Sequence, residues 1–363
     1  MHTFRCVCDN VLFFENSFCL QCSREAGYCP ACRMIVALIP TDGNRFCCGN
    51  PTCGAILVKC HNYVTYNVCN GCLQATDDNP VVDDASGSSL LCDRCRLTHT
   101  IPDLSVPGNI EKWYRLEVAK KRLLYDLDLL QLPYGTEPRE TRLALRFDFK
   151  ADVIPSRELW WNMGSKEQVF TGHMDGTITI NIREADDVER ERLRVELGEA
   201  QRTLLGHFRH EIGHYYWDIF VKDQRETDFT AIFGDHMNPS YQDALQRYYA
   251  DQPPTNWQSQ FVSAYATMHP WEDFAETFAT YLEMVSTLDT AHYLGFPGIC
   301  SFADLDTMIV QYQQLGITLN ELNRSKGLLD VVPEVITPGV KGKIRFIHQL
   351  TAASPGRTLV HQP

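Results

Sequence analysis

The placement of cysteines constrains this chain more than any other feature. The chain has 15 cysteines in 363 residues, and all of them except Cys300 lie between Cys6 and Cys95. Such clustering indicates either disulfides or bound metal. The first residues, MHTFRCVCDN, lack a basic start followed by an apolar stretch, so we expect no secretory signal and a cytoplasmic location. Thiols stay reduced there, and metal binding is therefore the favoured interpretation.

Most of these cysteines stand in closely spaced pairs. A Cys-x-x-Cys turn aims two thiolates at one tetrahedral ion, so two such pairs make one closed zinc site. Pairing neighbours along the chain predicts three structural zinc sites: Cys6, Cys8, Cys19 and Cys22; Cys29, Cys32, Cys48 and Cys53; and Cys69, Cys72, Cys92 and Cys95. Cys47 competes for one place in the second site, and Cys60 is left unassigned. Closed four-cysteine sites have no open coordination position, so we expect no catalysis in this region.

The charge balance argues against two classes of partner. The formal net charge is -13, and within residues 1–98 Asp and Glu slightly outnumber Lys and Arg. A protein with a net negative charge does not attract phosphates or anionic lipid surfaces. No apolar run approaches the length of a membrane span. We therefore expect no nucleic-acid partner and no membrane association.

A proline- and glycine-punctuated stretch, TIPDLSVPGN, separates two regions of different composition. We predict a zinc-ribbon region over residues 1–99, a linker over 100–109 and a second domain over 110–363. Hydrophobic periodicity predicts that the second domain is of the α+β class. The expected elements before the next motif are a helix over 110–132, strands over 142–149 and 176–182, and a helix that starts near 183 and continues into that motif.

The stretch LLGHFRHEIGHYYWD contains the spacing His210-Glu211-x-x-His214. On a helix, residues four apart project from the same face, so both imidazoles can bind one ion. Glu211 then lies beside the first ligand, where it can take a proton from a water that zinc has made acidic. The pattern predicts a catalytic zinc site with Glu211 as general base.

A third zinc ligand is needed, and a later helix is its expected source. Another class of zinc peptidase would require His or Asp at position 220 and Gly at 217, but the chain has Phe220 and Trp217. The stretch HPWEDFAETFATYLEM instead provides Glu272 and Glu276, four apart on one helical face. We expect Glu272 to be the ligand and Glu276 to orient a histidine from behind, although the two could exchange roles.

Three supporting features are also expected near this site. Asp218, one turn after His214, could orient that histidine. The strand over 176–182 is expected to be an edge strand that binds an extended peptide. An electrophile should stabilise the developing oxyanion, and its candidates are Tyr265, His269, His173 and His236.

These motifs together resemble those of the gluzincins, in which HExxH is followed some fifty to seventy residues later by E-x-x-x-[DE]. Some gluzincins carry an oxyanion-stabilising tyrosine seven residues before the ligand glutamate, and the resemblance assigns that role to Tyr265. More narrowly, FRCVCDNVLFFENSFCLQC, TIPDLSVPGN, RTLLGHFRHEIGHYYWD and FVSAYATMHPWEDFAETFATYLEM look like the bacterial zinc-binding metallopeptidases with an N-terminal zinc ribbon. The resemblance implies a zincin-like (gluzincin) metallopeptidase domain behind a multi-zinc ribbon module. The extra cysteines over 29–60 depart from the simplest members of that family.

The predicted function is zinc-dependent hydrolysis of a peptide or related amide bond, with a peptide or protein as substrate. We expect one catalytic zinc ion and about three structural zinc ions. Two alternatives stay open at this point. One is a non-enzymatic zinc-ribbon adaptor that carries a degenerate peptidase fold, and the other is a hydrolase of a non-peptide amide.

Overall fold

The computed structural model describes residues 1–75, 90–137, 142–152, 171–190, 192, 203–251, 253–300 and 304–353. The chain forms two compact units. Unit 1 contains residues 1–121, 146–171 and 179–186, and unit 2 contains residues 122–145, 172–178 and 187–363. The chain passes between the units within α3 (Asn109–Leu129) and β11 (Thr177–Asn181). The compact units therefore do not divide at residues 100–109, and the predicted linear domain boundary stays a prediction.

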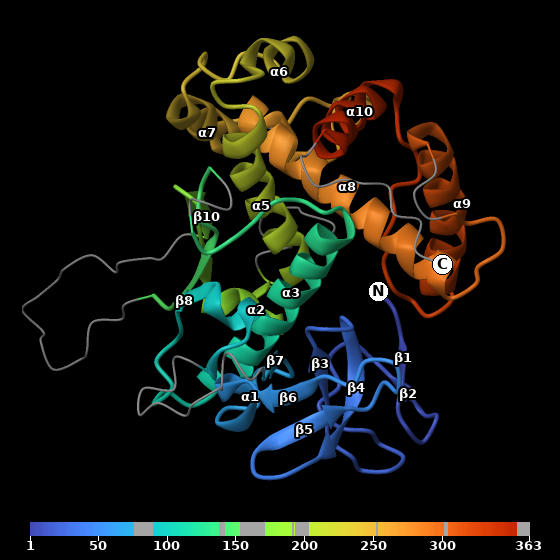
Figure 1. The fold of residues 1–363 in the computed structure, drawn as a ribbon. Coiled ribbons are helices and arrows are strands. Elements are labelled where there is room, and N and C mark those ends of the chain that lie inside the picture. Colours follow the sequence, from blue (N-terminus) through green and yellow to red (C-terminus); the bar gives the residue numbers. More distant parts are fainter. Residues whose placement is uncertain are drawn as a thin grey trace, which may run out of the picture. The chain divides into compact units, whose positions relative to one another are not determined.

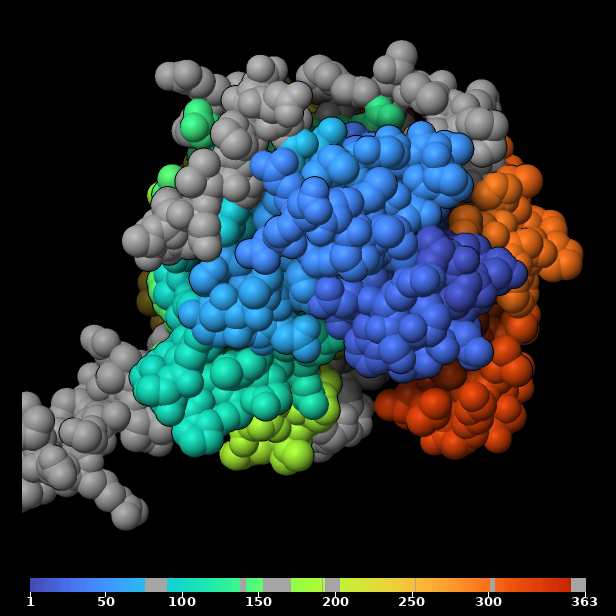
Figure 2. Space-filling model, turned by 60° about the horizontal axis from the view of Figure 1, so that its bottom comes forward, coloured from blue at the N-terminus to red at the C-terminus, as the bar shows by residue number. Residues whose placement is uncertain are grey.

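Unit 1 begins with small antiparallel sheets that carry the cysteines (Figure 1). One sheet pairs β1 with β2, and a five-stranded sheet has the order β3-β4-β5-β6-β7. The apolar residues Val36, Leu38 and Leu57 are buried together with seven cysteines in a single cluster. Figure 2 shows the surface of these N-terminal residues in blue. The elements are β1 (Phe4–Arg5), β2 (Val11–Leu12), β3 (Ala26–Cys29), β4 (Met34–Pro40), β5 (Arg45–Cys48), β6 (Ile56–Lys59), α1 (His61–Val64), β7 (Cys72–Gln74) and α2 (Asp93–Arg96).

A further sheet contains the strands that were predicted after the linker. In unit 1, β8 (Thr98–Thr100) pairs in parallel with β9 (Arg146–Lys150), and β11 is the next strand, followed by η2 (Ile182–Ala185). In unit 2, β10 (Gly172–Met174) lies on the other side of β11. The prediction that residues 176–182 form an edge strand is wrong, because β11 has a neighbour on both sides. Among the described residues, β10 is the strand at that end of the sheet.

Unit 2 is largely helical, and the long helix α8 (Pro270–Tyr293) lies at its centre. Figure 1 shows α5 (Leu204–Phe220), α9 (Leu305–Arg324) and α10 (Pro338–Ala352) packed against α8. The backbones of α5 and α8 touch where a Cβ on Gly213 would lie 2.8 Å from Ala275 Cα. No helix among the described residues is long and apolar enough to cross a membrane. The other helices of this unit are α6 (Glu226–Phe233), α7 (Tyr241–Ala250), η3 (Trp257–Ser259) and η4 (Tyr265–Thr267).

The start of α5 corrects one expectation. The predicted helix that runs unbroken from residue 183 into the zinc motif is interrupted at Thr203, which has an extended backbone with φ -107° and ψ 152°. Its side-chain oxygen accepts a hydrogen bond from the Gly206 amide at 2.9 Å and so caps a new helix. Residues 193–202 lie outside the described part of the chain.

A buried ion pair inside unit 2 links α3 to α5 next to the zinc motif. The Nε and Nη2 atoms of Arg209 donate to Asp126 Oδ2 at 3.0 and 2.9 Å. Removing one partner leaves a buried charge without compensation, so we expect Asp126→Ala to lower the free energy of unfolding by about 3 to 5 kcal/mol. Urea unfolding of the zinc-loaded protein measures this loss. The double variant Asp126→Ala/Arg209→Ala should lose less than the sum of the single variants, and additive losses would contradict the coupling.

Candidate metal centres

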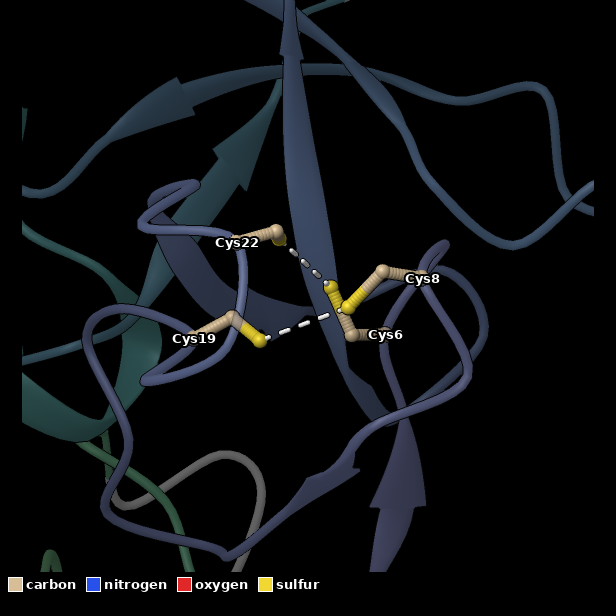
Figure 3. Close-up of side chains that lie close together, drawn as sticks. All are labelled: Cys6, Cys8, Cys19 and Cys22. Carbon is tan, nitrogen blue, oxygen red and sulfur yellow. Dashed lines mark hydrogen bonds between the residues drawn. The ribbon is translucent and has the colours of Figure 1, made fainter.

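The first cysteine cluster joins two turns near the N-terminus. Figure 3 shows the sulfur atoms of Cys6, Cys8, Cys19 and Cys22 pointing toward one another. The Sγ atoms of Cys6 and Cys22 are 3.6 Å apart, as are those of Cys8 and Cys19. The second turn is closed by a hydrogen bond from the Ser23 amide to the Cys19 carbonyl at 2.8 Å. The structure thus brings together the four residues predicted for the first zinc site.

The second cluster contains Cys29, Cys32, Cys48 and Cys53, as predicted. Its Sγ atoms are 3.8 Å apart between Cys29 and Cys53 and also between Cys32 and Cys48. Cys47, which competed for a place, is not in the cluster. Successive side chains of a strand point to opposite faces, and Cys47 and Cys48 are neighbours on β5, so only one of them can face the metal site.

The third cluster contains Cys60, Cys69, Cys92 and Cys95, so the prediction that Cys72 belongs to it is wrong. Cys72 begins β7, and its Sγ packs so closely on β3 that a Cβ on Gly27 would lie 2.9 Å from it. Cys60 instead lies between β6 and α1, and its Sγ accepts a hydrogen bond from the Cys92 amide at 3.4 Å.

The spacing of the sulfur atoms fits zinc and excludes disulfides. A tetrahedral zinc ion with bonds of about 2.3 Å to sulfur places neighbouring sulfur atoms about 3.8 Å apart. The closest sulfur pairs are 3.6, 3.8 and 3.7 Å apart in the first, second and third cluster, respectively. A disulfide would require a distance of about 2.05 Å, and all of the cysteines are free thiols.

A fourth group of metal-ligating side chains lies between α5 and α8 of unit 2. The Nε2 atoms of His210 and His214 are 3.1 Å apart, and Glu272 Oε2 lies 3.0 Å from the first and 3.4 Å from the second. Tetrahedral zinc with bonds of about 2.0 Å requires ligand atoms about 3.3 Å apart. These three residues therefore fit one zinc ion, with Glu272 rather than Glu276 facing it.

Glu276 supports this group from behind, as expected. Its Oε1 lies 2.6 Å from His210 Nδ1, so that nitrogen carries the proton and Nε2 is left free for a metal. Burial lowers the pKa of His210, but hydrogen bonds to Glu272 and Glu276 outweigh this and raise the pKa well above its usual range. Burial would also raise the pKa of Glu272, yet the charges and hydrogen bonds of His214 and His210 hold it well below its usual range.

Asp218 does not orient His214, contrary to expectation. Its carboxylate lies 3.9 Å from His173 and 3.8 Å from Lys222 instead. The His214 Nδ1 atom is buried and has no hydrogen-bond partner among the described residues. The His214 ring is held by Trp271, whose ring centroid is 3.7 Å away at an interplanar angle of 31°.

Glu211 lies on α5 beside this group but is not one of its three ligands. Its side chain is buried, and its Oε2 atom has no hydrogen-bond partner among the described residues. Burial raises the pKa of Glu211 above its ordinary value. A carboxylate in this state is a good proton acceptor, which agrees with its predicted role.

Of the four candidate electrophiles, Tyr265 has the most suitable position. Its ring centroid is 6.0 Å from that of His210, and burial, followed by the charge of Glu272, raises its pKa, so the hydroxyl remains a donor. His269 is used as a helix cap, because its Nδ1 accepts the Trp271 amide at 3.1 Å. The other two histidines serve packing: His173 is buried with its pKa lowered to about 3 by burial, and the His236 ring contacts that of Trp217.

The structure adds one residue that the sequence did not suggest. The hydroxyl of Tyr241, at the start of α7, donates to Glu272 Oε1 at 2.9 Å. Tyr241 stands thirty-one residues before Glu272 in an otherwise polar helix, and no spacing rule marks it. Only the fold reveals this contact.

Comparisons with known proteins agree with this picture. Residues 109–350 match the family model described as "Putative zinc-binding metallo-peptidase", and residues 3–106 match a zinc-ribbon domain. Uncharacterized proteins of Mycobacterium bovis and Mycobacterium tuberculosis are 36% identical over 359 residues, which covers 96% of this chain and 94% of theirs. No solved structure matches the chain. The chain therefore belongs to the zinc-binding metallo-peptidase family of that model and carries a zinc-ribbon domain before its peptidase region.

Proposed function

We propose that this protein is a zinc-dependent peptidase that cleaves a peptide or related amide bond in a peptide or protein substrate. The observation that carries the proposal is the triangle of His210 Nε2, His214 Nε2 and Glu272 Oε2. Glu211 lies on the same helix as the two histidines, and its Oε2 atom has no hydrogen-bond partner among the described residues. Three protein ligands leave one position of a tetrahedral ion open, which distinguishes a catalytic centre from the closed cysteine sites. The full zinc complement is one catalytic and three structural ions, one for each cluster.

The residues of the chain divide the chemistry among them. When bound, zinc supplies Lewis acidity, which polarises a carbonyl group and makes a neighbouring water more acidic. Glu211 accepts a proton from the attacking water and returns it to the leaving nitrogen. Tyr265 donates a hydrogen bond to the carbonyl oxygen as negative charge develops on it.

Strand β10 provides a surface for an extended substrate. It is the end strand of its sheet within the described residues, and its His173 ring packs against Tyr215 of α5 at a centroid distance of 6.0 Å. A peptide that adds to such an edge by backbone hydrogen bonds would lie next to the helix that carries the zinc motif.

The zinc content of Glu272→Ala tests the centre on which this function depends. Elemental mass spectrometry should find about four zinc ions per wild-type chain and about three in the variant, with hydrolysis lost. Asp228→Ala, which removes an exposed acid from α6 of the same unit, is the matched control and should keep all of them. A wild type that holds only the structural ions would support the adaptor instead, and unchanged zinc in Glu272→Ala would refute its role as ligand.

A further inference from the structure

Tyr241 and the two histidines contact different oxygen atoms of Glu272. Oε2 faces the Nε2 atoms of His210 and His214 at 3.0 and 3.4 Å. Oε1 accepts a hydrogen bond from the Tyr241 hydroxyl at 2.9 Å. The carboxylate is thus divided into one metal-facing oxygen and one oxygen that is already occupied.

The tyrosine ring is fixed by the same aromatic residues that surround the ligands. Its centroid lies 5.4 Å from that of His269 and 5.8 Å from that of Trp271, both in edge-to-face geometry. Trp271 in turn stacks on the ligand His214. The backbone beneath Tyr241 is also anchored, because the Ser240 side chain caps α7. A ring held from two sides delivers its hydroxyl to Glu272 with little loss of conformational entropy on binding.

We propose that Tyr241 is a positioning residue that holds Glu272 as a one-oxygen ligand and so keeps the fourth coordination position open. This inference rests on the proposed zinc centre. A carboxylate that is released from its second partner can turn both oxygens toward a metal ion, and the second oxygen would then occupy the place that water and substrate need.

Tyr241 and Tyr265 therefore have different tasks at one site. Tyr241 reaches Glu272 directly, whereas Tyr265 packs over His210, shares a hydrogen bond with Tyr241 and is assigned to the substrate oxygen. Loss of the Tyr241 hydroxyl should change metal binding, since hydrogen-bond partners behind a ligand typically contribute about 10- to 100-fold to metal affinity. Loss of the Tyr265 hydroxyl should slow hydrolysis and lower metal affinity less than loss of the Tyr241 hydroxyl does, because Tyr265 reaches Glu272 only through Tyr241.

The experiment compares Tyr241→Phe, Tyr265→Phe and Tyr249→Phe in the full chain. Tyr249 is an exposed tyrosine on the same helix and serves as the matched control. Zinc affinity of the weakest site is measured by competition with a chromogenic chelator, and thermal unfolding of each zinc-loaded variant is recorded alongside it. We expect affinity to fall about 10- to 100-fold in Tyr241→Phe, clearly less in Tyr265→Phe and not at all in Tyr249→Phe. The unfolding temperature of zinc-loaded Tyr241→Phe should fall by no more than its weaker zinc binding accounts for.

A double variant separates positioning from a general loss of structure. In the Glu272→Ala background only the two histidines remain as ligands, and titration with excess zinc measures their weak affinity. Tyr241→Phe should change that affinity by less than about twofold, because the group it positions is gone. A Tyr241→Phe variant that binds zinc with wild-type affinity would overturn the proposal. This holds even if the variant hydrolyses more slowly, since Tyr241 would then act on the substrate. These affinities are measured without any substrate, so a protein that binds zinc but hydrolyses no peptide would refute the proposed function and leave this test intact.

Discussion

Glu211→Gln is expected to lower kcat by about 10²- to 10⁴-fold while the zinc content stays unchanged. Glutamine has nearly the same shape as glutamate but cannot take up a proton at neutral pH. The Glu211 side chain is buried, its Oε2 atom has no hydrogen-bond partner within the described part of the chain, and it is not one of the three ligand residues. The substitution therefore removes the base and leaves the metal-binding triangle in place. Cleavage of a mixed peptide library, followed by mass spectrometry and elemental zinc analysis of the same samples, measures both quantities.

The control for this comparison is Glu321→Gln, which makes the same change at an exposed position of α9 in the same unit. It should match the wild type in rate and in zinc content. A Glu211→Gln variant that hydrolyses at the wild-type rate would rule out the general-base mechanism. A wild type that cleaves no peptide but does cleave isopeptide or simple amide substrates would instead identify a hydrolase of non-peptide amides.

Cys60→Ser is expected to lose one zinc ion and much of the stability of unit 1. Cys60 supplies one of four sulfur atoms to the third cluster, and structural zinc sites contribute about 10 to 16 kcal/mol in small zinc peptides. Cys72→Ser should keep all zinc ions, because Cys72 lies outside that cluster and packs against Gly27. It should cost only about 1 to 3 kcal/mol, the penalty for placing a hydroxyl in a buried apolar position.

These two variants form a matched pair, because both remove one sulfur atom from a buried position of the same sheet region. Zinc per chain and the midpoint of thermal unfolding give the comparison, and Cys47→Ser serves as a third reference outside every cluster. If Cys72→Ser lost zinc and Cys60→Ser kept it, the third site would be built from the two Cys-x-x-Cys pairs after all.

The sequence was most informative where function depends on short spacings. His210 and His214 are held on one face by a single helix, and Glu272 and Glu276 are related in the same way, so local periodicity placed each pair correctly. The spacing of one helical turn indicated that the two glutamates would divide the roles of ligand and support but left open which was which, and the structure places Glu272 with the histidines and Glu276 behind His210. The first two cysteine clusters were predictable for a similar reason, since neighbouring turns in a small sheet can reach one ion.

The remaining features depend on pairing between strands and on packing between helices. Cys72 stands in a Cys-x-x-Cys motif, but the register of β7 against β6 turns its sulfur away from the third cluster. Asp218 is one turn from His214, yet its carboxylate lies near Lys222 and His173. The position of β11 inside its sheet and the contact of Tyr241 with Glu272 are likewise set by distant parts of the chain. Spacing along the sequence carries no information about these partners.

The close contact between Gly213 and Ala275 has a consequence for which ions the centre accepts. The two helices touch backbone to backbone within a turn of the ligands, so they hold the ligand atoms at a fixed and short separation. Calcium needs six to eight oxygen ligands with bonds of about 2.3 to 2.6 Å, and a pair of imidazoles with one carboxylate oxygen cannot supply them. The centre therefore discriminates against calcium by ionic size and against magnesium by ligand preference, and cobalt or nickel should compete with zinc there far better than either.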